Sequence, residues 1–388
     1  MIQRLCVITD RYPTKEYPLN TFLDQLVCQF ADTGIHCTVV APYSRVRDII
    51  KKKDYHAPKH YVKRTEKGAE ISVYCPNFFI ITGRKMGPFN FARLYQHLFD
   101  KAVQRVLKKT GTDFDAFYGH FITPSGFSAV RMGQLYHRPS FIAYGECFLD
   151  QDSCNFSIPE IRNKISDVNG IVAVSTKNKD ELLANRIVDS DKISVFPNAV
   201  NSSRFYKMDK QEARRILGFD QKDFITAFVG DFIDRKGVLR VSEALKGIGE
   251  AKSIFIGGGP QKPDCQGILF SGKLPHDQIA TYLNAADIFV LPTLAEGCCN
   301  AIIEAMACGL PIVSSDLPFN DDILDPSNSI RIDPENVEEI RKAIRKLQED
   351  KVLRENLAAG ALKTAAGLTI ELRAARIVDF IEEKSQTT

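Results

Sequence analysis

The segment Leu291–Ser315, LPTLAEGCCNAIIEAMACGLPIVSS, combines residue types that could bind an anion and a polyol. An apolar strand ends at Pro292, a loop containing a glycine follows, and the pattern predicts a helix that begins near Asn300. The first turn of a helix leaves backbone N–H groups unpaired and carries a partial positive charge. The segment therefore predicts an anion site at a helix N-terminus.

Glu304 lies on this otherwise small and apolar helix, where a carboxylate is costly unless a donor meets it. The hydroxyl groups of a bound sugar or ribose are one such donor, and a buried Arg is the structural alternative. Glu296, eight residues earlier in the loop, is by itself an ordinary surface acid. Spacing alone leaves both interpretations of Glu304 open.

A second segment, FVGDFIDRKGV (Phe228–Val238), places two adjacent cations after a predicted strand. Arg235 and Lys236 open the next helix. Adjacent cations are usually solvated, but at the carboxyl end of a strand they are well placed to neutralise phosphates. The run GGGP at residues 257–260 adds a strand exit where backbone can approach a ligand. Both features favour a ligand that carries phosphate.

His120 ends the predicted strand Ala116–Phe121, immediately before a turn and a helix. An isolated His is as well explained by a structural hydrogen bond as by catalysis, but this one lies in the predicted ligand crevice. Asp113–Asp115 and Asp150–Asp152 are D-x-D triplets, which could hold a metal on a different fold, but nothing nearby has ligand character. The ten cysteines contain no C-x-x-C pair, so they give no support to a structural zinc site.

Length and composition exclude several classes of protein. The chain has 388 residues, 44% of them hydrophobic and 26% charged, which suits two folded domains rather than a disordered or fibrous chain. Its apolar runs are strand-sized, and its N-terminus has the pattern of neither a signal peptide nor a membrane anchor. These features and the cysteine usage favour a soluble protein of the reducing cytoplasm. No G-x-G-x-x-G follows the first strand and there is no P-loop, so NAD-linked and ATP-hydrolysing activities lack support.

Charge is divided unevenly along the chain. Residues 1–170 carry 23 Lys and Arg against 16 Asp and Glu, whereas residues 171–388 carry 28 against 32. The densest basic stretch, Arg45–Lys67, has nine Lys and Arg and two His against three acids. It is either a solvated loop and helix face, or a patch that meets an anionic membrane surface or a phosphate-bearing substrate. Nucleic acid is disfavoured, because no aromatic-basic or helix-turn-helix pattern accompanies the charge.

Short apolar strands alternate with helix-length segments from end to end, which is typical of a parallel sheet covered by helices on both faces. In the first half, strands are expected at 5–9, 36–42, 71–76, 116–121, 140–145 and 170–175, and helices at 21–31, 90–110, 124–137 and 177–188. In the second half, strands are expected at 224–230, 253–256, 268–270, 288–291 and 312–314, and helices at 238–247, 276–286, 300–308 and 337–349. The fold class is therefore α/β, with two doubly wound Rossmann-like domains joined near Phe196–Asn198. Ligands are expected in a shared cleft at the carboxyl ends of the strands.

Several motifs together resemble those of the family 4 glycosyltransferases, a large retaining group with the GT-B fold. The segment EGCCNAIIE, from Glu296 to Glu304, is similar to that family's E-x7-E signature, and VGDFIDRKGV is similar to its VGR-x-x-x-x-KG element. FPNAVNSSRF resembles its PNGVD-x-x-x-F linker, GGGP its GDGP turn, and FDAFYGHFITPSGFSAV the strand and loop with its active-site His. The resemblance spans nearly the whole chain and is strongest over Phe224–Ser315.

The resemblance implies roles for the matched positions. Arg235 and Lys236 would bind the donor diphosphate and stabilise it as it leaves, and Glu304 would accept hydrogen bonds from the nucleotide ribose. Glu296 would lie by the hydroxyls of the donor sugar, and His120 would reach that sugar from the opposite domain. The other implied donor-binding positions are Gly258, Gly272, Lys273, Leu274, Gly297, Cys298, Cys299 and Asn300. Such a site needs no metal, because preorganised cations and a helix N-terminus stabilise the charge that develops on the leaving diphosphate.

By this resemblance the chain is a retaining, metal-independent hexosyltransferase of cell-surface polysaccharide biosynthesis. It would move a sugar from a UDP- or GDP-sugar to a hydroxyl of a cell-surface glycan precursor or a lipid-linked acceptor. It would act in the cytoplasm or at the inner face of the membrane. Residues 1–196, with a C-terminal helix at 370–388 that crosses back, would form the acceptor-side domain, and residues 197–369 the donor-binding domain.

The chain departs from the family pattern mostly around the sugars. Tyr17–Thr21 replaces a glycine pair, Asn198–Asn201 loses the Gly and Asp of the linker, Cys298–Cys299 replaces an aromatic-Gly pair, and Tyr144–Glu146 replaces a His-Gly element. The alternatives are a sugar-nucleotide epimerase, a glycan phosphorylase and a degenerate nucleotide-sugar-binding module. The intact acids and cations argue against the epimerase and the module, and the lack of a recognisable Lys-centred pyridoxal site argues against the phosphorylase.

Overall fold

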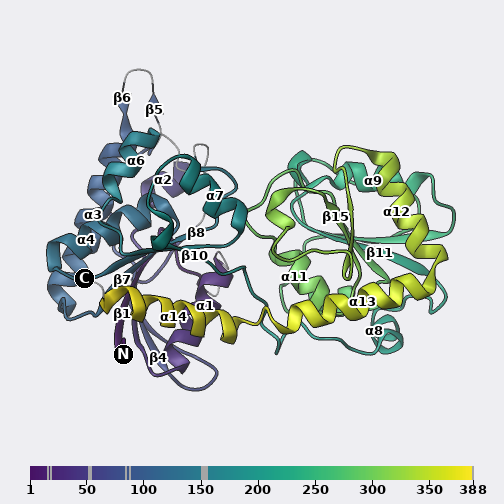
Figure 1. Cartoon of the computed structure of the whole chain (residues 1–388), viewed down its shortest axis with the longest axis horizontal. Coiled ribbons are helices and arrows are strands. Elements are labelled where there is room, and N and C mark those ends of the chain that lie inside the picture. The colour runs from purple at the N-terminus through teal and green to yellow at the C-terminus, as the bar shows by residue number, and fades with distance from the viewer. Residues whose placement is uncertain are drawn as a thin grey trace. The chain divides into compact units, whose positions relative to one another are not determined.

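The computed structural model describes residues 1–14, 17, 20–50, 55–83, 85–86, 89–149 and 156–386. The chain divides into two compact units: Met1–Phe196 together with Arg373–Thr388, and Pro197–Leu372. Each unit contains its own largely parallel sheet between layers of helices (Figure 1). None of the helices in the described ranges combines the length and the apolar character that a membrane span requires.

Among the described residues, the sheet of the first unit has eight strands in the order β10-β9-β8-β7-β1-β2-β4-β3. They are β1 (Arg4–Ile8), β2 (His36–Val40), β3 (His60–Arg64), β4 (Glu70–Tyr74), β7 (Ala116–His120), β8 (Ser140–Tyr144), β9 (Gly170–Ala173) and β10 (Ile193–Val195). Neighbouring strands are parallel except β3 and β4, which are antiparallel. A separate short hairpin is formed by β5 (Lys85–Met86) and β6 (Phe89–Asn90).

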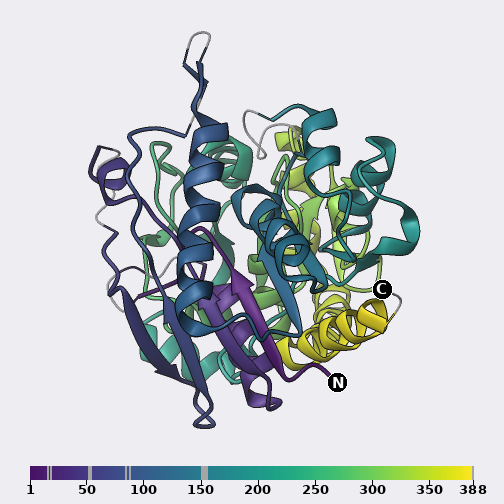
Figure 2. The same cartoon turned by 90° about the vertical axis from the view of Figure 1, so that its left-hand side faces the viewer.

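Helices cover both faces of this sheet (Figure 2). Successive side chains of a strand point to opposite faces, and in the buried strands the side chains on both faces are mostly apolar and need to be covered. Phe117 of β7 packs into an apolar cluster with residues of α3 (Phe91–Thr110) and α4 (Phe127–Tyr136). Its neighbour Tyr118 contacts Phe30 of α1 (Thr21–Asp32), and Phe141 of β8 contacts Phe380 of α14 (Ile370–Gln386). The other helical elements are α2 (Arg45–Ile50), η1 (Ile122–Gly126), α6 (Ile158–Lys164), α7 (Thr176–Ala184) and η2 (Ser190–Lys192).

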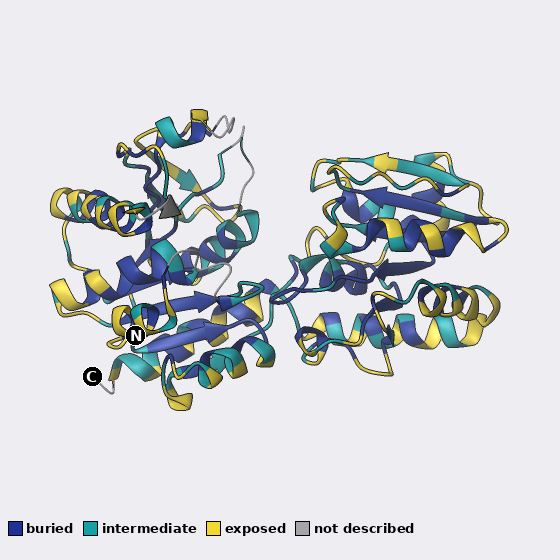
Figure 3. Ribbon diagram, turned by 90° about the horizontal axis from the view of Figure 1, so that it is seen from above, coloured by how far each residue is buried: buried dark blue, intermediate teal, exposed yellow. Residues whose placement is uncertain are grey.

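The second unit has a fully parallel sheet in the order β13-β12-β11-β14-β15-β16. Its strands are β11 (Phe224–Val229), β12 (Ala251–Ile256), β13 (Ile268–Gly272), β14 (Ile288–Leu291), β15 (Ile312–Ser315) and β16 (Ser329–Ile332). Its helical elements are α8 (Lys210–Leu217), η3 (Asp234–Lys236), α9 (Val238–Lys246), α10 (Ile279–Ala285), α11 (Asn300–Ala307), η4 (Pro318–Asn320), α12 (Val337–Glu349) and α13 (Lys351–Ala366). Figure 3 shows buried strands between amphipathic helices in each unit.

The predicted fold class is confirmed, since both units are doubly wound α/β structures. The elements that the pattern did not predict include several short strands and helices, and also the 16-residue helix α13, whose buried face of Leu357, Ala361 and Ala365 consists mostly of small residues and gives a weak apolar signal. In β3, for example, the sequence HYVKR alternates between exposed and half-buried residues, so it lacks the apolar alternation of a core strand. α8 is strongly polar, with four charged residues among its eight.

The basic stretch Arg45–Lys67 is divided between opposite edges of the first sheet. It begins with α2, after the carboxyl end of β2, and runs into β3, whose Arg64 pairs with Glu70 at the amino end of β4. Lys63 forms an ion pair with Asp24, and Arg64 with Glu70. Residues 51–54 of this stretch, and the predicted triplet at 150–152, lie outside the described residues.

The strand order in each unit reverses at one place, which marks where ligands bind in doubly wound folds. In the first unit this place lies between β1 and β7, and in the second between β11 and β14. His120 is the last residue of β7. The segments with Arg235, Lys236 and Glu296 follow β11 and β14.

The most enclosed ion pair of the second unit predicts a large effect on its stability. Arg214 of α8 donates to Asp287 Oδ2 at 2.8 Å and to the carbonyl of Ala285 at 2.9 Å, and it is only 3% exposed. We expect Arg214→Ala to lower the free energy of unfolding by about 3–5 kcal/mol, because it leaves Asp287 buried with only part of its partners. Urea denaturation measures this change.

Arg215, the next residue, provides the matched control. Its partner Glu212 and Arg215 itself are both exposed, so Arg215→Ala should change the free energy of unfolding by less than about 1 kcal/mol. Equal urea midpoints for the two variants would contradict the structural role of the Arg214–Asp287 pair.

Candidate donor-binding site

Three donors converge on one carboxylate oxygen at the carboxyl ends of β11 and β14. Arg235 Nη1 donates to Glu296 Oε1 at 3.0 Å, Lys236 Nζ donates to the same oxygen, and Thr293 Oγ1 donates to it at 3.0 Å. Glu296 is only 9% exposed, so the interpretation of this residue as an ordinary surface acid is wrong. Two cations held against one buried carboxylate leave a net positive charge for an anionic ligand.

The two loops that carry this cluster are tied to each other by backbone contacts. The N–H of Leu294 donates to the carbonyl of Arg235 at 2.8 Å, and Arg235 Nη1 donates to the carbonyl of Ala295 at 2.6 Å. Gly237 adopts φ +80°, and a Cβ there would lie 2.6 Å from the carbonyl oxygen of Pro292. Glycine is therefore needed for the close approach that fixes the cations.

A pocket of about 470 Å³ opens beside this cluster. Of the positions predicted from the sequence, it is lined by Lys236, Gly258, Lys273, Leu274, Glu296, Cys298, Cys299 and Asn300. Asp231 and Ile279 also line it, and neither was among the positions predicted from the sequence. A Cβ on Gly258 would lie 2.7 Å from Lys273 Cε, so the glycine makes room for the lysine side chain at the pocket wall.

The N-terminus of α11 forms one wall of this pocket. The helix begins at Asn300, and the side chain of the preceding Cys299 makes no capping hydrogen bond. Burial raises the pKa of the Cys299 thiol to about 11, so the thiol is protonated and uncharged where it lines the pocket. Burial by itself would lower the pKa of Lys236, but the charge of Glu296 and its hydrogen bond to the ammonium raise that pKa, so the ammonium stays charged. The pocket thus combines a helix N-terminus with a fixed cation.

Glu304 lies one turn further along α11 and does not line the pocket. His276 Nε2 lies 3.1 Å from Glu304 Oε1, and the His276 ring contacts Phe205 edge-on at 5.2 Å. A histidine therefore meets this carboxylate, rather than the buried Arg considered from the sequence. His276 is the first residue of the helix expected at 276–286, and nothing in that pattern marked it as a partner of Glu304.

The remaining predicted positions lie around the pocket rather than on its wall. Arg235 donates to Glu296 without lining the pocket, Gly297 follows Glu296 in the loop after β14, and Gly272 is the last residue of β13. Gly272 accepts a hydrogen bond at its carbonyl from Gly257 N at 2.8 Å. The linker residue Asn198 donates through Nδ2 to the carbonyl of Cys298 at 2.9 Å, which fixes the loop before α11.

His120 belongs to the first unit and is 5% exposed. Its ring lies 5.3 Å from that of Phe22 and 4.7 Å from that of Phe121, and its Nδ1 has no hydrogen-bond partner. Burial, with a smaller contribution from the charge of Arg373, lowers the pKa of His120 to about 3. The side chain is therefore a neutral imidazole at physiological pH.

Glu146 lies in the neighbouring loop after β8, where a departure from the family pattern was noted. Its Oε1 accepts from Ile122 N at 2.9 Å and its Oε2 from Gly145 N at 3.0 Å. The carboxylate thus holds the turn that follows His120.

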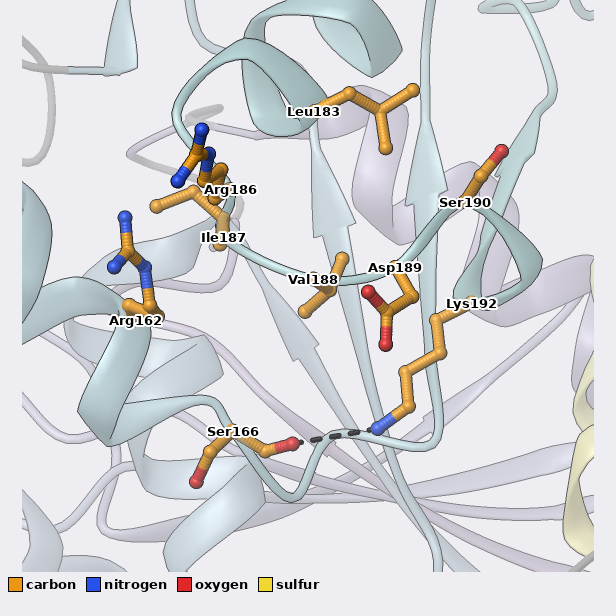
Figure 4. A pocket seen from close by; sticks show the side chains of 9 residues that line it. All are labelled: Arg162, Ser166, Leu183, Arg186, Ile187, Val188, Asp189, Ser190 and Lys192. Carbon is orange, nitrogen blue, oxygen red and sulfur yellow. Dashed lines mark hydrogen bonds between the residues drawn. The ribbon is translucent and has the colours of Figure 1, made fainter.

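Another pocket of the first unit, of about 430 Å³, is lined by Arg162, Ser166, Leu183, Arg186, Ile187, Val188, Asp189, Ser190 and Lys192 (Figure 4). Its loops precede β9 and β10, so it lies at the amino ends of the strands, opposite to where ligands of this fold bind. Within the described ranges, no group of three or more His, Cys, Asp or Glu is placed to hold a metal ion.

Comparisons with known proteins agree with this geometry. Residues 209–364 match the family model described as glycosyl transferases group 1. Over 372 residues, 92% of each chain, this protein is 25% identical to TuaC of Bacillus subtilis strain 168, described as a teichuronic acid biosynthesis glycosyltransferase. Over 232 residues it is 29% identical to the UDP-Gal:alpha-D-GlcNAc-diphosphoundecaprenol alpha-1,3-galactosyltransferase of Escherichia coli, a match that covers 54% of this chain and 59% of that one. Sucrose-phosphate synthase from Thermosynechococcus elongatus has the same fold, with a TM-score of 0.78 at 17% identity over 100% of both chains.

The buried His120 predicts that acid destabilises the first unit. The unfolded chain protonates this His below about pH 6.5 while the folded chain does not, so the unfolded state binds more protons and stability falls as pH falls. By pH 5 the loss attributable to His120 should reach about 2 kcal/mol. We expect His120→Asn to remove this loss, so that Tm falls less between pH 7.5 and pH 5 than in the native protein.

His36, exposed at the start of β2 in the same unit, is the control. His36→Asn should leave the dependence of Tm on pH unchanged. If the profile of His120→Asn runs parallel to that of the native protein, the burial of a neutral His120 is not what sets the acid sensitivity.

Proposed function

Since this chain belongs to the group 1 glycosyl transferase family and has the GT-B fold, we propose that it transfers a sugar from a UDP- or GDP-sugar, with retention of anomeric configuration. The acceptor is a hydroxyl of a cell-surface glycan precursor or a lipid-linked glycan. The observation that carries this proposal is the pair of cations held against buried Glu296 at the N-terminus of α11. UDP as the nucleotide and a lipid-linked acceptor are supported by the relative from Escherichia coli, whose name specifies both.

In this mechanism the second unit stabilises the leaving group. Departure of a nucleoside diphosphate develops negative charge on its phosphates, and preorganised charges lower the barrier most when they need not move as that charge forms. Lys236 and the first turn of α11 face the same pocket, and Arg235 is anchored to the loop of Glu296. These groups bind the diphosphate without a metal ion.

Glu296 has two roles in the proposed cycle. Without donor it balances Arg235 and Lys236, which keeps both cations ordered in a partly buried site where unpaired charge is costly. With donor bound, the phosphates share these cations and the carboxylate accepts hydrogen bonds from hydroxyls of the donor sugar. The pairing seen in the structure is thus the resting form of the site.

Glu304 binds the ribose hydroxyls, and His276 holds its carboxylate until they arrive. Gly272, Lys273 and Leu274 border the nucleobase. His120 of the first unit contributes to the donor sugar as a neutral hydrogen-bonding group rather than as a proton donor, because its pKa lies far below physiological pH.

A thermal-shift screen tests the donor class. UDP or GDP at 100 times its dissociation constant should stabilise the protein by about 2.7 kcal/mol, with or without a chelator, whereas ADP and CMP should do so much less. Lys236→Ala should abolish the response, because the diphosphate loses its buried cation. The control Lys246→Ala removes an exposed lysine of α9 that pairs with Asp264 and should keep the full response. No response of the native protein to any nucleotide would favour a degenerate binding module instead.

The role of Glu304 is tested with nucleotides that lack the ribose hydroxyls. Glu304→Ala should weaken binding of the preferred nucleoside diphosphate by about 10- to 100-fold, because hydrogen bonds to a charged acceptor are lost. The same substitution should leave the weaker affinity for the 2′,3′-dideoxy analogue almost unchanged. Calorimetric titration measures all four affinities, and equal losses for both nucleotides would mean that Glu304 acts on the fold of α11 and not on the ribose.

A further inference from the structure

We propose that the first unit carries a bilayer-inserting surface at the carboxyl edge of its sheet, and that this surface docks on an anionic lipid leaflet. The surface, here named the apolar platform, consists of Ile49, Ile50, Phe79, Ile81, Phe89 and Leu94. Each of these side chains is between 46% and 70% exposed. Docking on the leaflet does not depend on the proposed function. Only one consequence of docking, the place where the protein would bind a lipid-linked acceptor, rests on that function.

Five of the six platform residues come from three segments that contact one another, and the sixth, Phe89 of β6, lies 6.3 Å from the ring of Phe91 at the start of α3. Ser44, just before α2, donates through Oγ to the carbonyl of Ile80 at 2.8 Å. The guanidinium of Arg47 lies 4.8 Å from the ring of Tyr95 on α3, and Phe78 contacts the same ring edge-on at 5.3 Å. Residues of α2, of the segment after β4 and of the first turns of α3 therefore form one neighbourhood.

All three segments lie at the carboxyl edge of the sheet. α2 follows β2 and residues 75–83 follow β4, whereas α3 runs antiparallel to the strands and so begins at this edge. At 20 residues, about 30 Å, α3 is much longer than the five-residue strands beside it. The β5–β6 hairpin that precedes it extends beyond the rest of the unit, as Figures 1 and 2 show.

The segment at residues 78–81 is apolar on both faces. Phe78 and Ile80 are buried in the core cluster beneath α3, while the alternating Phe79 and Ile81 point outward and are 70% and 56% exposed. A strand-like segment that faces water normally places polar residues at its outward positions. Grouped exposed apolar residues mark a surface that is covered in use.

The cations beside the platform indicate that an anionic lipid leaflet covers it. Arg45 is exposed on α2, and within the described ranges no acid pairs with it or with Arg47. The acid of α2, Asp48, is buried and paired with Arg11, so it does not oppose a negative surface. The sequence continues from Ile50 directly into Lys51–Lys53. Apolar side chains flanked by cations suit the boundary between acyl chains and anionic headgroups.

The membrane-facing residues thus differ from those expected from charge alone. Lys63 and Arg64, in the second half of the basic stretch, are paired with acids, and Arg64 lies at the amino end of β4. The platform instead shares the carboxyl edge of the sheet with His120. Docking there would bring this edge of the first unit to the headgroup layer, where the phosphates of a lipid-linked acceptor lie.

Vesicle flotation tests the platform with the full chain. The native protein should bind vesicles of phosphatidylcholine with phosphatidylglycerol and not those of phosphatidylcholine alone. The double variant Phe79→Ser, Ile81→Ser should bind at least about tenfold more weakly, because two exposed apolar side chains no longer leave water. The control Val352→Ser changes an equally exposed apolar residue on α13 of the second unit and should bind as the native protein does.

A fluorescence experiment locates the insertion. Because the chain contains no Trp, Phe79→Trp introduces a single reporter, and Val352→Trp is its control. Emission of the first variant should shift to shorter wavelength on anionic vesicles and be quenched by lipids brominated on their acyl chains. That of the second should not change.

Three results would overturn the proposal. They are no binding of the native protein to anionic vesicles at low salt, unchanged binding of the double serine variant, and concentration-dependent self-association that the double variant abolishes. The thermal response to UDP or GDP is measured on the same variants and should persist in each. Failure of the platform is thereby distinguished from misfolding and from failure of the proposed function.

Discussion

The meeting of three hydrogen-bond donors on Glu296 Oε1 is the interaction on which the candidate site depends. The carboxylate of Glu296 is 9% exposed, and an unpaired charge at such a site costs free energy. The two cations repel each other unless an anion lies between them. The ion pairs of Glu296 with Arg235 and Lys236 therefore lower the cost of all three charges. The sheet of the second unit makes this pairing possible, because the loops after β11 and β14 leave the same edge at the point where the strand order reverses. The backbone contacts between Arg235 and residues 294–295 then hold the two loops in register.

Much of the fold could be predicted from the sequence, because parallel strands buried on both faces are near-continuous apolar runs. Strands such as Ile288–Leu291 and helices such as Val337–Glu349 lie where the pattern placed them. Elements that carry no periodic apolar face, such as β3 and α8, could not be found in this way, since they depend on tertiary neighbours rather than on their own pattern.

The candidate site was predictable in its residue types but not in its pairings. The spacing of Glu296 and Glu304 pointed to the loop after β14 and to α11, and the Arg235–Lys236 pair to the turn after β11; the structure brings Glu296 and the two cations together. Whether an acid is buried depends on what approaches it from distant sequence, which spacing does not contain. For the same reason His276, 28 residues from Glu304 along the chain, could not be identified as its partner.

Net charge and local geometry serve different purposes in this chain. The second half carries a slight excess of acids, so an anionic donor is not drawn to it by its overall charge; the attraction must come from a few cations and helix N–H groups held at short range. The first half carries the excess of cations, and a field of that kind acts on extended negative surfaces rather than on one small ligand. Cation excess alone does not say which part of a surface makes contact, because several of these cations are neutralised in pairs, as with Lys63 and Asp24. In the proposed docking, burial of the apolar platform beside Arg45 and Arg47 would add a short-range contribution to binding, and this contribution would fix the orientation of the first unit on a leaflet.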